Sequence, residues 1–365
     1  MNGKNCSQLA VDTEFERRTT FFAHLALVQI YDGQSIYLID PLQVSCPDEL
    51  RKVFADPKIS IILHSCKEDL EVLYTAWQCK ISALMDTQIA YQFAKGDVSI
   101  GYAKLVETLL GHQIDKQQTC SDWMKRPLTP EQLSYAAIDV VYLPEIANDL
   151  EQQLVDCNLQ HLFQQECDEL TVNAINRVEQ MPDYREAKDV WRLTSSQLSL
   201  FKQLFEWREN IARNQNRTRN HIIRDHSMVA LAQSEATNYE QLKLISDIHP
   251  RSLRLYACDW FDIIQQWQST TAADNSPITP AAVLNPRDVK GFKPLSDRLE
   301  KSIKKIASEN CLHPTLLMSK RLIRRLSFLM LTQSNWRSSL SGWRKELLTD
   351  EIGQCFEQFK AQNAV

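Results

Sequence analysis

The sequence predicts a mixed α/β domain followed by all-α domains, and three observations lead to this prediction. In the first third of the chain, strand patterns alternate with helical patterns, as expected for a sheet covered by helices. After about residue 155 the strand patterns stop, and from Ser195 onward the apolar spacing is helical. A polar, proline-containing stretch at 269–294 interrupts the helical region and is the clearest linker.

The elements of the first third follow from their patterns in order. Strands are expected at 8–15, 25–31, 35–40 and 59–64, and Asp32-Gly33 is a hairpin turn signal between the second and third. Helices are expected at 67–77, 86–95, 101–110 and 130–153. Three opening strands followed by alternation indicate a mixed sheet.

The rest of the chain is expected to be helical. Segment 155–192 leads through Met181-Pro182-Asp183, and a final helical unit covers about 295–362. We therefore expect three domains, at residues 1–192, 195–270 and 290–365.

Composition limits the class of protein. Hydrophobic residues make up 44% and charged residues 24%, which is ordinary for a folded globular chain and argues against disorder. No apolar run approaches the ~18 residues that span a bilayer, and the first ten residues lack an apolar signal core. We therefore expect a cytoplasmic protein. None of the 10 cysteines forms a C-x-x-C pair, so we expect reduced thiols and no zinc site.

The formal net charge of -5 hides an asymmetry along the chain. Residues 1–150 carry 20 acidic and 13 basic residues, whereas residues 286–326 carry 11 basic and 4 acidic residues. An acidic N-terminal part is typical of a site that binds divalent cations, and a basic later segment is typical of one that binds a phosphate backbone. Charge runs are also common on solvated helix faces, so this pattern alone decides nothing.

Five residues are candidates for a reaction centre. Asp12 and Glu14 alternate along a strand and so project from one face. Asp69 follows the apolar strand and begins a helix, near the edge where strand ends converge. Tyr135 and Asp139 lie four residues apart on a helix and so share a face. Each pattern alone also fits an ordinary surface acid or core tyrosine.

The order of these motifs makes the pattern specific. D-T-E-F, then H-S-x-K-E-D-L-E, then Y-x-x-x-D occur in sequence, with the strings LVQIYDG, LIDPL, MDTQIA, SDWMKRPLTPEQLSYAAIDVVYL and SGWRKELL. With these strings, nearly the whole chain resembles ribonuclease D, of an exonuclease superfamily with four acids and a tyrosine or histidine. The histidine branch would need histidine at Ser134, so the tyrosine branch is indicated.

The resemblance implies a ribonuclease H-like exonuclease domain, with a mixed five-stranded sheet, followed by helical HRDC-type domains. It implies a 3′→5′ exoribonuclease that uses two divalent cations, Mg²⁺ or Mn²⁺, and releases nucleoside 5′-monophosphates. Asp12, Glu14 and Asp139 would hold one ion, and Asp12 would bridge to a second that Asp69 supports through water. Tyr135 would orient the attacking water. Precursors of tRNA are the expected RNA partners, and no obligate protein partner is implied.

Further residues are candidates for substrate contacts. Phe15 could stack on the terminal base, and His64 could contact the terminal ribose. Phe15 could equally be a core residue, and for His64 a hydrogen-bonded core histidine is slightly favoured. Lys116 and Arg126 could bind phosphate or could be solvated loop charges, and Thr13 lies between the two strand acids. Gln29 is a polar residue in an apolar strand, so it should need a hydrogen-bond partner.

The back half departs from the family pattern in one place. Residues 207–225 resemble the first helix and turn of an HRDC domain, but Asn220-His221 stands where a proline is usual. At the front, only eleven residues precede Asp12, where the family has an extra strand and helix. Either the sheet lacks an edge strand or the chain begins further upstream.

Two other functions remain open from the sequence. A DNA 3′→5′ exonuclease would use the same catalytic motifs, since nothing in them reads a 2′-hydroxyl group. A non-catalytic nucleic-acid-binding protein would need a decayed site, whereas all five residues are present.

Overall fold

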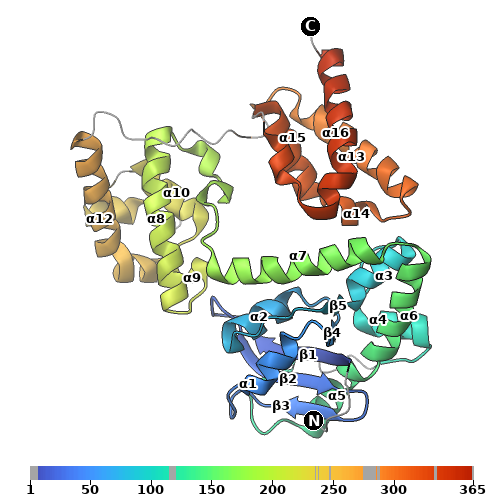
Figure 1. The fold of residues 1–365 in the computed structure, drawn as a ribbon. Coiled ribbons are helices and arrows are strands. Elements are labelled where there is room, and N and C mark those ends of the chain that lie inside the picture. The colour runs from blue at the N-terminus through green and yellow to red at the C-terminus, as the bar shows by residue number, and fades with distance from the viewer. Residues whose placement is uncertain are drawn as a thin grey trace. The chain divides into compact units, whose positions relative to one another are not determined.

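The computed structural model describes residues 7–363 of the chain except 115–120, 235, 237, 246–247, 274–284, 286–287 and 333–334. Packing divides the chain into two units. Unit 1 comprises Met1–Glu16, His24–Val178 and Val289–Val365, and unit 2 comprises Arg17–Ala23 and Glu179–Asp288. Figure 1 labels their elements. Within the described ranges, every helix is too short or too polar to cross a lipid bilayer.

Unit 1 contains a mixed five-stranded sheet with the order β3-β2-β1-β4-β5, which confirms the predicted fold class. β1 pairs antiparallel with β2 and parallel with β4, so it lies at the centre. The strands are β1 (Gln8–Glu16), β2 (His24–Tyr31), β3 (Ile36–Ile39), β4 (Ser60–Leu63) and β5 (Leu84–Asp86).

The hairpin between β2 and β3 follows from two residues. Gly33 has φ +85°, a left-handed conformation that glycine adopts without steric cost. The Asp32 carboxylate accepts hydrogen bonds from the backbone amides of Gln34 and Ser35 at 2.9 and 2.7 Å. This turn sets the register that places Val28 opposite Ile39.

Helices cover the sheet (Figure 1). Helices α2 and α5 both pack against β1 and β2, and α6 packs against β1 and β4. The helices of this part are α1 (Asp48–Phe54), α2 (Lys67–Trp77), α3 (Thr87–Lys95), α4 (Tyr102–Leu110), α5 (Pro130–Val141), α6 (Leu143–Asp156) and α7 (Gln160–Glu179).

Two expected helical segments are wrong in their extent. The segment 130–153 is two helices that meet at Tyr142, because Pro144 has no N–H to donate to the carbonyl of Val140. In the segment 155–192, α6 ends at Asp156 and a new helix runs from Gln160 to Glu179, shortly before Pro182. Short 3₁₀ turns follow, η1 (Tyr184–Glu186) and η2 (Val190–Arg192).

The C-terminal helices belong to unit 1. Trp343 is buried, its ring lies 5.6 Å from that of Phe93, and its indole N–H donates to Glu166 of α7 at 2.9 Å. These contacts join the last helix to the α/β part. The elements are α13 (Phe292–Glu309), α14 (Pro314–Leu317), α15 (Lys320–Thr332), η4 (Trp336–Ser339) and α16 (Gly342–Asn363).

Unit 2 is helical and has its own core, in which Phe201, Leu204 and Trp260 are fully buried. Phe21, from the connection between β1 and β2, belongs to the same core. At the ends of the linker expected at 269–294, the last helix of unit 2 continues to Ala273 and the next helix begins at Phe292. Residues 274–284 and 286–287 of that stretch lie outside the described residues. The α-helices are α8 (Ser195–Asn214), α9 (Arg219–Ile222), α10 (Asp225–Ser234), α11 (Tyr239–Leu244) and α12 (Pro250–Ala273).

Candidate active site

The central strand β1 presents two of the candidate acids. Asp12 and Glu14 are both half-buried and, two residues apart on a strand, project from the same face. Pairing with β4 extends only to Ala10, whereas pairing with β2 continues along the strand. The two carboxylates therefore lie where β4 has ended and the sheet opens.

Asp69 approaches the same strand from helix α2. It lies in the first helical turn, is 8% exposed, and its carboxylate accepts a hydrogen bond from the Thr13 hydroxyl. The preceding turn is held by the buried carboxylate of Asp86, which accepts from the amides of Ser65 and Cys66 at 3.1 and 2.9 Å. Asp86 thus fixes the start of the helix that carries Asp69.

Helix α5 supplies Asp139 and Tyr135, one turn apart. The helix starts with a capping box, in which Thr129 and Gln132 satisfy each other's backbone amides. It packs against β1, β2 and β3. One carboxylate oxygen each from Asp12, Glu14 and Asp139 lies within 4.8 Å of the other two. The fold therefore brings together acids that are up to 127 residues apart in the sequence.

Burial and mutual repulsion raise the pKa values of this group. Burial is the main cause for every member, and it raises the pKa of Glu14 to about 8, of Asp139 to about 7 and of Asp69 to about 6. The pKa of Asp12 is raised well above its usual range by burial and by its neighbours Asp69, Asp139 and Glu14. Ionising all four acids is therefore costly unless a cation compensates the charge.

The donor set fits a hard divalent cation. Three carboxylates converge with their oxygens within 4.8 Å, and no histidine or cysteine is part of this group. Mg²⁺ and Mn²⁺ prefer such oxygen ligands. A bound cation would also favour the charged forms of the acids whose pKa values are raised. The site can therefore hold a divalent metal.

The tyrosine lies at the edge of a small apolar cluster. Tyr135 packs against a cluster that includes Leu27, Trp123 and Ala136, and its ring centre is 6.0 Å from that of Trp123. The cluster fixes the ring on the helix turn before Asp139. The predicted role of its hydroxyl in orienting water stays a prediction.

The residues predicted to contact substrate differ in whether their side chains already have partners within the protein. Phe15 is half-buried at a register shift that follows Glu14, and Thr13 donates to Asp69. His64 is held by Thr87 Oγ1 at 2.9 Å from Nδ1 and by the Ile100 carbonyl at 3.1 Å from Nε2. Both ring nitrogens of His64 are thus engaged within the protein. Lys116 lies outside the described residues.

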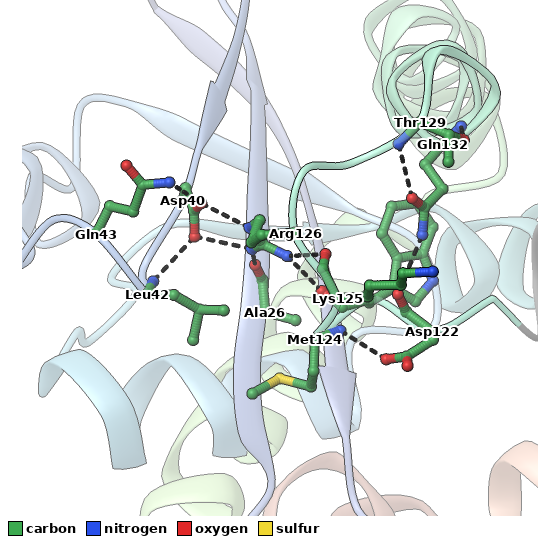
Figure 2. Close-up of polar contacts among 11 residues, drawn as sticks. Ala26, Asp40, Leu42, Gln43, Asp122, Met124, Lys125, Arg126, Thr129 and Gln132 are labelled. Atoms are coloured by element: carbon green, nitrogen blue, oxygen red, sulfur yellow. Dashed lines mark hydrogen bonds and ion pairs between the residues drawn. The ribbon is translucent and has the colours of Figure 1, made fainter.

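Arg126 is bound within the protein rather than presented to solvent (Figure 2). Its Nε and Nη2 donate to the two carboxylate oxygens of Asp40 at 2.7 and 2.8 Å, and Nη2 also donates to the Ala26 carbonyl at 2.6 Å. Nη1 donates to the carbonyls of Trp123 and Lys125. The guanidinium lowers the pKa of Asp40. These contacts tie the loop before α5 to β2 and to the residue after β3.

Two polar residues near the site were not assigned a role from the sequence. The sequence does contain a signal for Asp86, because an acid directly before an apolar helical run is typical of a helix N-cap. Gln29 lies opposite Asp12 in the β1–β2 pair and is fully buried. The expected partner for its amide is missing among the described residues, since neither side-chain atom makes a hydrogen bond there.

Two family models match the chain. Residues 1–155 match the family model described as 3′-5′ exonuclease, and residues 197–264 match that of the HRDC domain. The chain thus contains a 3′→5′ exonuclease domain followed by an HRDC domain.

Full-length relatives define the family more closely. Ribonuclease D from Pseudomonas paraeruginosa is 33% identical over 96% of this chain and 92% of its own. Ribonuclease D from Shewanella is 31% identical over 95% of this chain and 88% of its own. The crystal structure of Escherichia coli RNase D, an exoribonuclease involved in structured RNA processing, superposes with a TM-score of 0.87 at 28% identity, covering 96% and 93% of the two chains. The chain belongs to the ribonuclease D family and is a 3′→5′ exoribonuclease.

Proposed function

We propose that Asp12, Glu14, Asp69, Tyr135 and Asp139 form the reaction centre of this exoribonuclease and that it works with two divalent cations. The observation that carries the proposal is the convergence of the Asp12, Glu14 and Asp139 carboxylates within 4.8 Å. Their raised pKa values support it, because such a group is stabilised by a cation.

The residues divide into roles. Asp12, Glu14 and Asp139 would hold the first ion. Asp12 would also contact the second ion, and Asp69 would support that ion through water. The Tyr135 hydroxyl would orient the water that attacks the phosphate, because a neutral phenol is a poor base and leaves the activation of water to the metal. The chemistry supplied by bound Mg²⁺ or Mn²⁺ is activation of water and neutralisation of charge on the phosphate.

We propose structured RNAs with 3′ extensions, such as tRNA precursors, as the substrates and nucleoside 5′-monophosphates as the products. The likeness to the Escherichia coli enzyme involved in structured RNA processing supports this substrate class. Such a substrate would place the activity in the cytoplasm. We propose three domains, an exonuclease domain at 1–192, an HRDC domain at 195–270 and a second helical domain at 290–365. The exonuclease domain would cleave the RNA, and the two helical domains would bind it.

The test uses a 5′-labelled tRNA precursor with extra 3′ residues, incubated with and without Mg²⁺. We expect stepwise shortening from the 3′ end that stops in EDTA. Tyr135→Phe should lower kcat by roughly 10²-fold while leaving Mg²⁺ binding unchanged, since it removes only the hydroxyl. Shortening of a matched DNA at an equal or higher rate would contradict an RNA-specific role. A Tyr135→Phe variant with full activity would remove this residue from the reaction centre.

A further inference from the structure

Unit 2 contains a cavity of about 600 Å³ that none of the roles above uses. It lies where α9, the start of α10 and the start of α12 meet. Its volume is in the range of ~300–1,000 Å³ that is usual for small-ligand sites. The cavity is therefore large enough to receive a group from outside the protein.

The lining of this cavity is cationic. Arg217, Arg224 and Arg251 border it together with the imidazoles of His221 and His249. No acidic side chain occurs among the described residues that line it. A concave surface with one sign of charge concentrates the field and attracts ions of opposite sign. The cavity thus favours an anion.

The arginines of this segment fall into two sets. Arg208 and Arg219 are neutralised, by Asp225 at 2.6 Å and by Glu209 at 2.7 Å respectively. Arg224 and Arg251, by contrast, are exposed and form no ion pair within the described part of the chain. Among the described residues, Glu209 and Asp225 are thus paired with the two arginines outside the lining, and no acid that lines the cavity pairs with Arg224 or Arg251.

Polar groups inside the cavity complement the charge. Ser252, in the first turn of α12, is 4% exposed and borders the cavity. In that turn the Arg251 N–H donates to Nδ1 of His249 at 3.2 Å and the Leu253 N–H donates to the His249 carbonyl at 3.1 Å. The N-terminal end of the helix still carries a partial positive charge, which favours an anion next to it. Arg217 is fixed at the rim because its Nη1 donates to the Tyr256 hydroxyl at 3.0 Å. The site is thus already formed without a ligand.

We propose that this cavity is a phosphate-binding site that holds a backbone phosphate of the RNA substrate away from the scissile bond. RNA is favoured over other anions because the chain is an exoribonuclease and every nucleotide of its substrate carries a phosphate. Asn220 and His221, which stand where the HRDC pattern usually has a proline, both line the cavity. The departure from the family pattern is therefore part of the site. The inference rests on RNA being the substrate.

The experiment measures RNA binding by the full-length protein. A fluorescein-labelled single-stranded RNA is titrated in EDTA at several KCl concentrations, and a gel confirms that the RNA stays intact. The variants are Arg224→Gln, Arg251→Gln and the double variant. Arg254→Gln is the matched control, because Arg254 is exposed on the same helix, outside the cavity lining. The same proteins are assayed for hydrolysis of an RNA dinucleotide, which has no phosphodiester other than the scissile one.

We expect the double variant to raise the Kd for RNA roughly 10-fold. The slope of log Kd against log salt concentration should fall by about 0.7 for each phosphate that the variant no longer neutralises. The control should stay within about 2-fold of the wild type. Hydrolysis of the dinucleotide should be unchanged in all variants. A double variant with the Kd and salt dependence of the control would overturn the proposal. A double variant that loses dinucleotide hydrolysis by the same factor as RNA binding would overturn it too.

Competition separates the possible sources of the phosphate. Inorganic phosphate and 5′-AMP should displace the RNA only at millimolar concentrations. Tight binding of 5′-AMP that the double variant loses, with RNA binding unchanged, would assign the cavity to a free nucleotide and overturn the RNA assignment. If the wild type failed to hydrolyse any RNA, the proposed reaction centre would fail instead, whatever the cavity variants did to RNA binding.

Discussion

At the scale of single residues, the carboxylates of the candidate site combine burial with mutual repulsion. In the metal-free protein, the pKa is about 8 for Glu14, about 7 for Asp139 and about 6 for Asp69. The same groups titrate near ~4 in an unfolded chain. Between these values the folded chain binds protons that the unfolded chain has already released.

This difference predicts how stability depends on pH. Because the folded-state pKa values are raised, the stabilising contribution of these groups is fully present below about pH 4 and falls as the pH rises towards about 8. We expect urea unfolding in EDTA to show this loss between these limits, and saturating Mg²⁺ to offset it by binding only the folded chain. Asp139→Asn should flatten the profile in EDTA. An identical slope in the variant and the wild type would contradict the assigned pKa values.

Arg126 allows a prediction that separates two roles. Its guanidinium holds Asp40 and three backbone carbonyls, so Arg126→Ala should lower the free energy of unfolding by about 2 kcal/mol. Lys125→Ala, at the exposed neighbouring side chain, should change it by less than about 0.5 kcal/mol. If the role is structural, kcat/KM per folded molecule stays near that of the wild type. A raised KM with unchanged stability would instead support the predicted contact with substrate.

The sequence predicted part of this site for clear physical reasons. Strand alternation was enough to put Asp12 and Glu14 on one face, and helical spacing was enough to put Tyr135 next to Asp139. The partners of Arg126 could not be predicted, because Asp40 lies 86 residues away and meets it only through the fold. The same holds for His64, whose partners Thr87 and Ile100 come from other segments.

At the scale of elements, α5 is the helix on which the proposed site depends most. Its first turn is closed by the Thr129 hydroxyl, which accepts from the Gln132 amide at 3.2 Å, while the Gln132 side chain accepts from the Thr129 amide at 2.9 Å. The same Gln132 side chain donates to the Ser121 hydroxyl at 2.8 Å. The cap therefore also anchors the preceding loop.

Removing this cap should destabilise the helix. We expect Thr129→Ala to cost about 1 kcal/mol in the free energy of unfolding, measured with urea, because the backbone amide of Gln132 loses its acceptor. Thr129→Ser keeps a hydroxyl at the same position and should stay within about 0.5 kcal/mol of the wild type. Equal losses in both variants would show that the capping hydrogen bond is not what stabilises this end.

Element boundaries were predicted well where the local pattern was strong. Helix α2 has the predicted bounds 67–77, since its apolar spacing is regular and a left-handed residue, Gln78, ends it. Strand β5 was missed because it has only three residues and its last residue, Asp86, is also the N-cap of α3. A three-residue strand has too few positions to display alternation, so only its pairing with β4 defines it.

At the scale of the whole molecule, Glu166 of α7 makes the shortest polar contacts between the last helices and the α/β part, beside the ring contact of Trp343 with Phe93. Glu166 of α7 receives hydrogen bonds from the Trp343 indole and from Nη2 of Arg344, at 2.9 and 2.8 Å. Arg344 Nε also donates to the Leu316 carbonyl at 3.0 Å. These groups are half-buried or buried, so the loss of Glu166 would leave the indole N–H unpaired and Arg344 with only the longer ion pair to Glu169, at 3.6 Å.

We therefore expect Glu166→Ala to lower the free energy of unfolding by about 2–4 kcal/mol and to make the C-terminal helices more sensitive to limited proteolysis. The matched control is Asp168→Ala, because Asp168 is exposed on the same helix. It should change stability by less than about 0.5 kcal/mol. Equal proteolysis rates for both variants and the wild type would contradict the anchoring role of Glu166.

The division into units could not be read from the sequence. The patterns suggested three consecutive segments, whereas packing joins Val289–Val365 with the α/β part and assigns Arg17–Ala23 to unit 2. Phe21 illustrates the reason. It packs in the core of unit 2 and lies 5.2 Å from the Arg213 guanidinium and 4.6 Å from that of Arg219, about two hundred residues away in the chain. Local periodicity contains no information about such contacts.

The central claim is that the carboxylate group on β1, α2 and α5 is the reaction centre. The most direct measurement is the release of nucleoside 5′-monophosphates from the 3′ end of RNA in Mg²⁺, by the wild type and by Asp12→Asn. This substitution keeps the side-chain shape and removes one buried charge, so the folded state should be at least as stable. Release by Asp12→Asn should fall by roughly 10³-fold or more. An Asp12→Asn protein that releases monophosphates at the wild-type rate would contradict the claim.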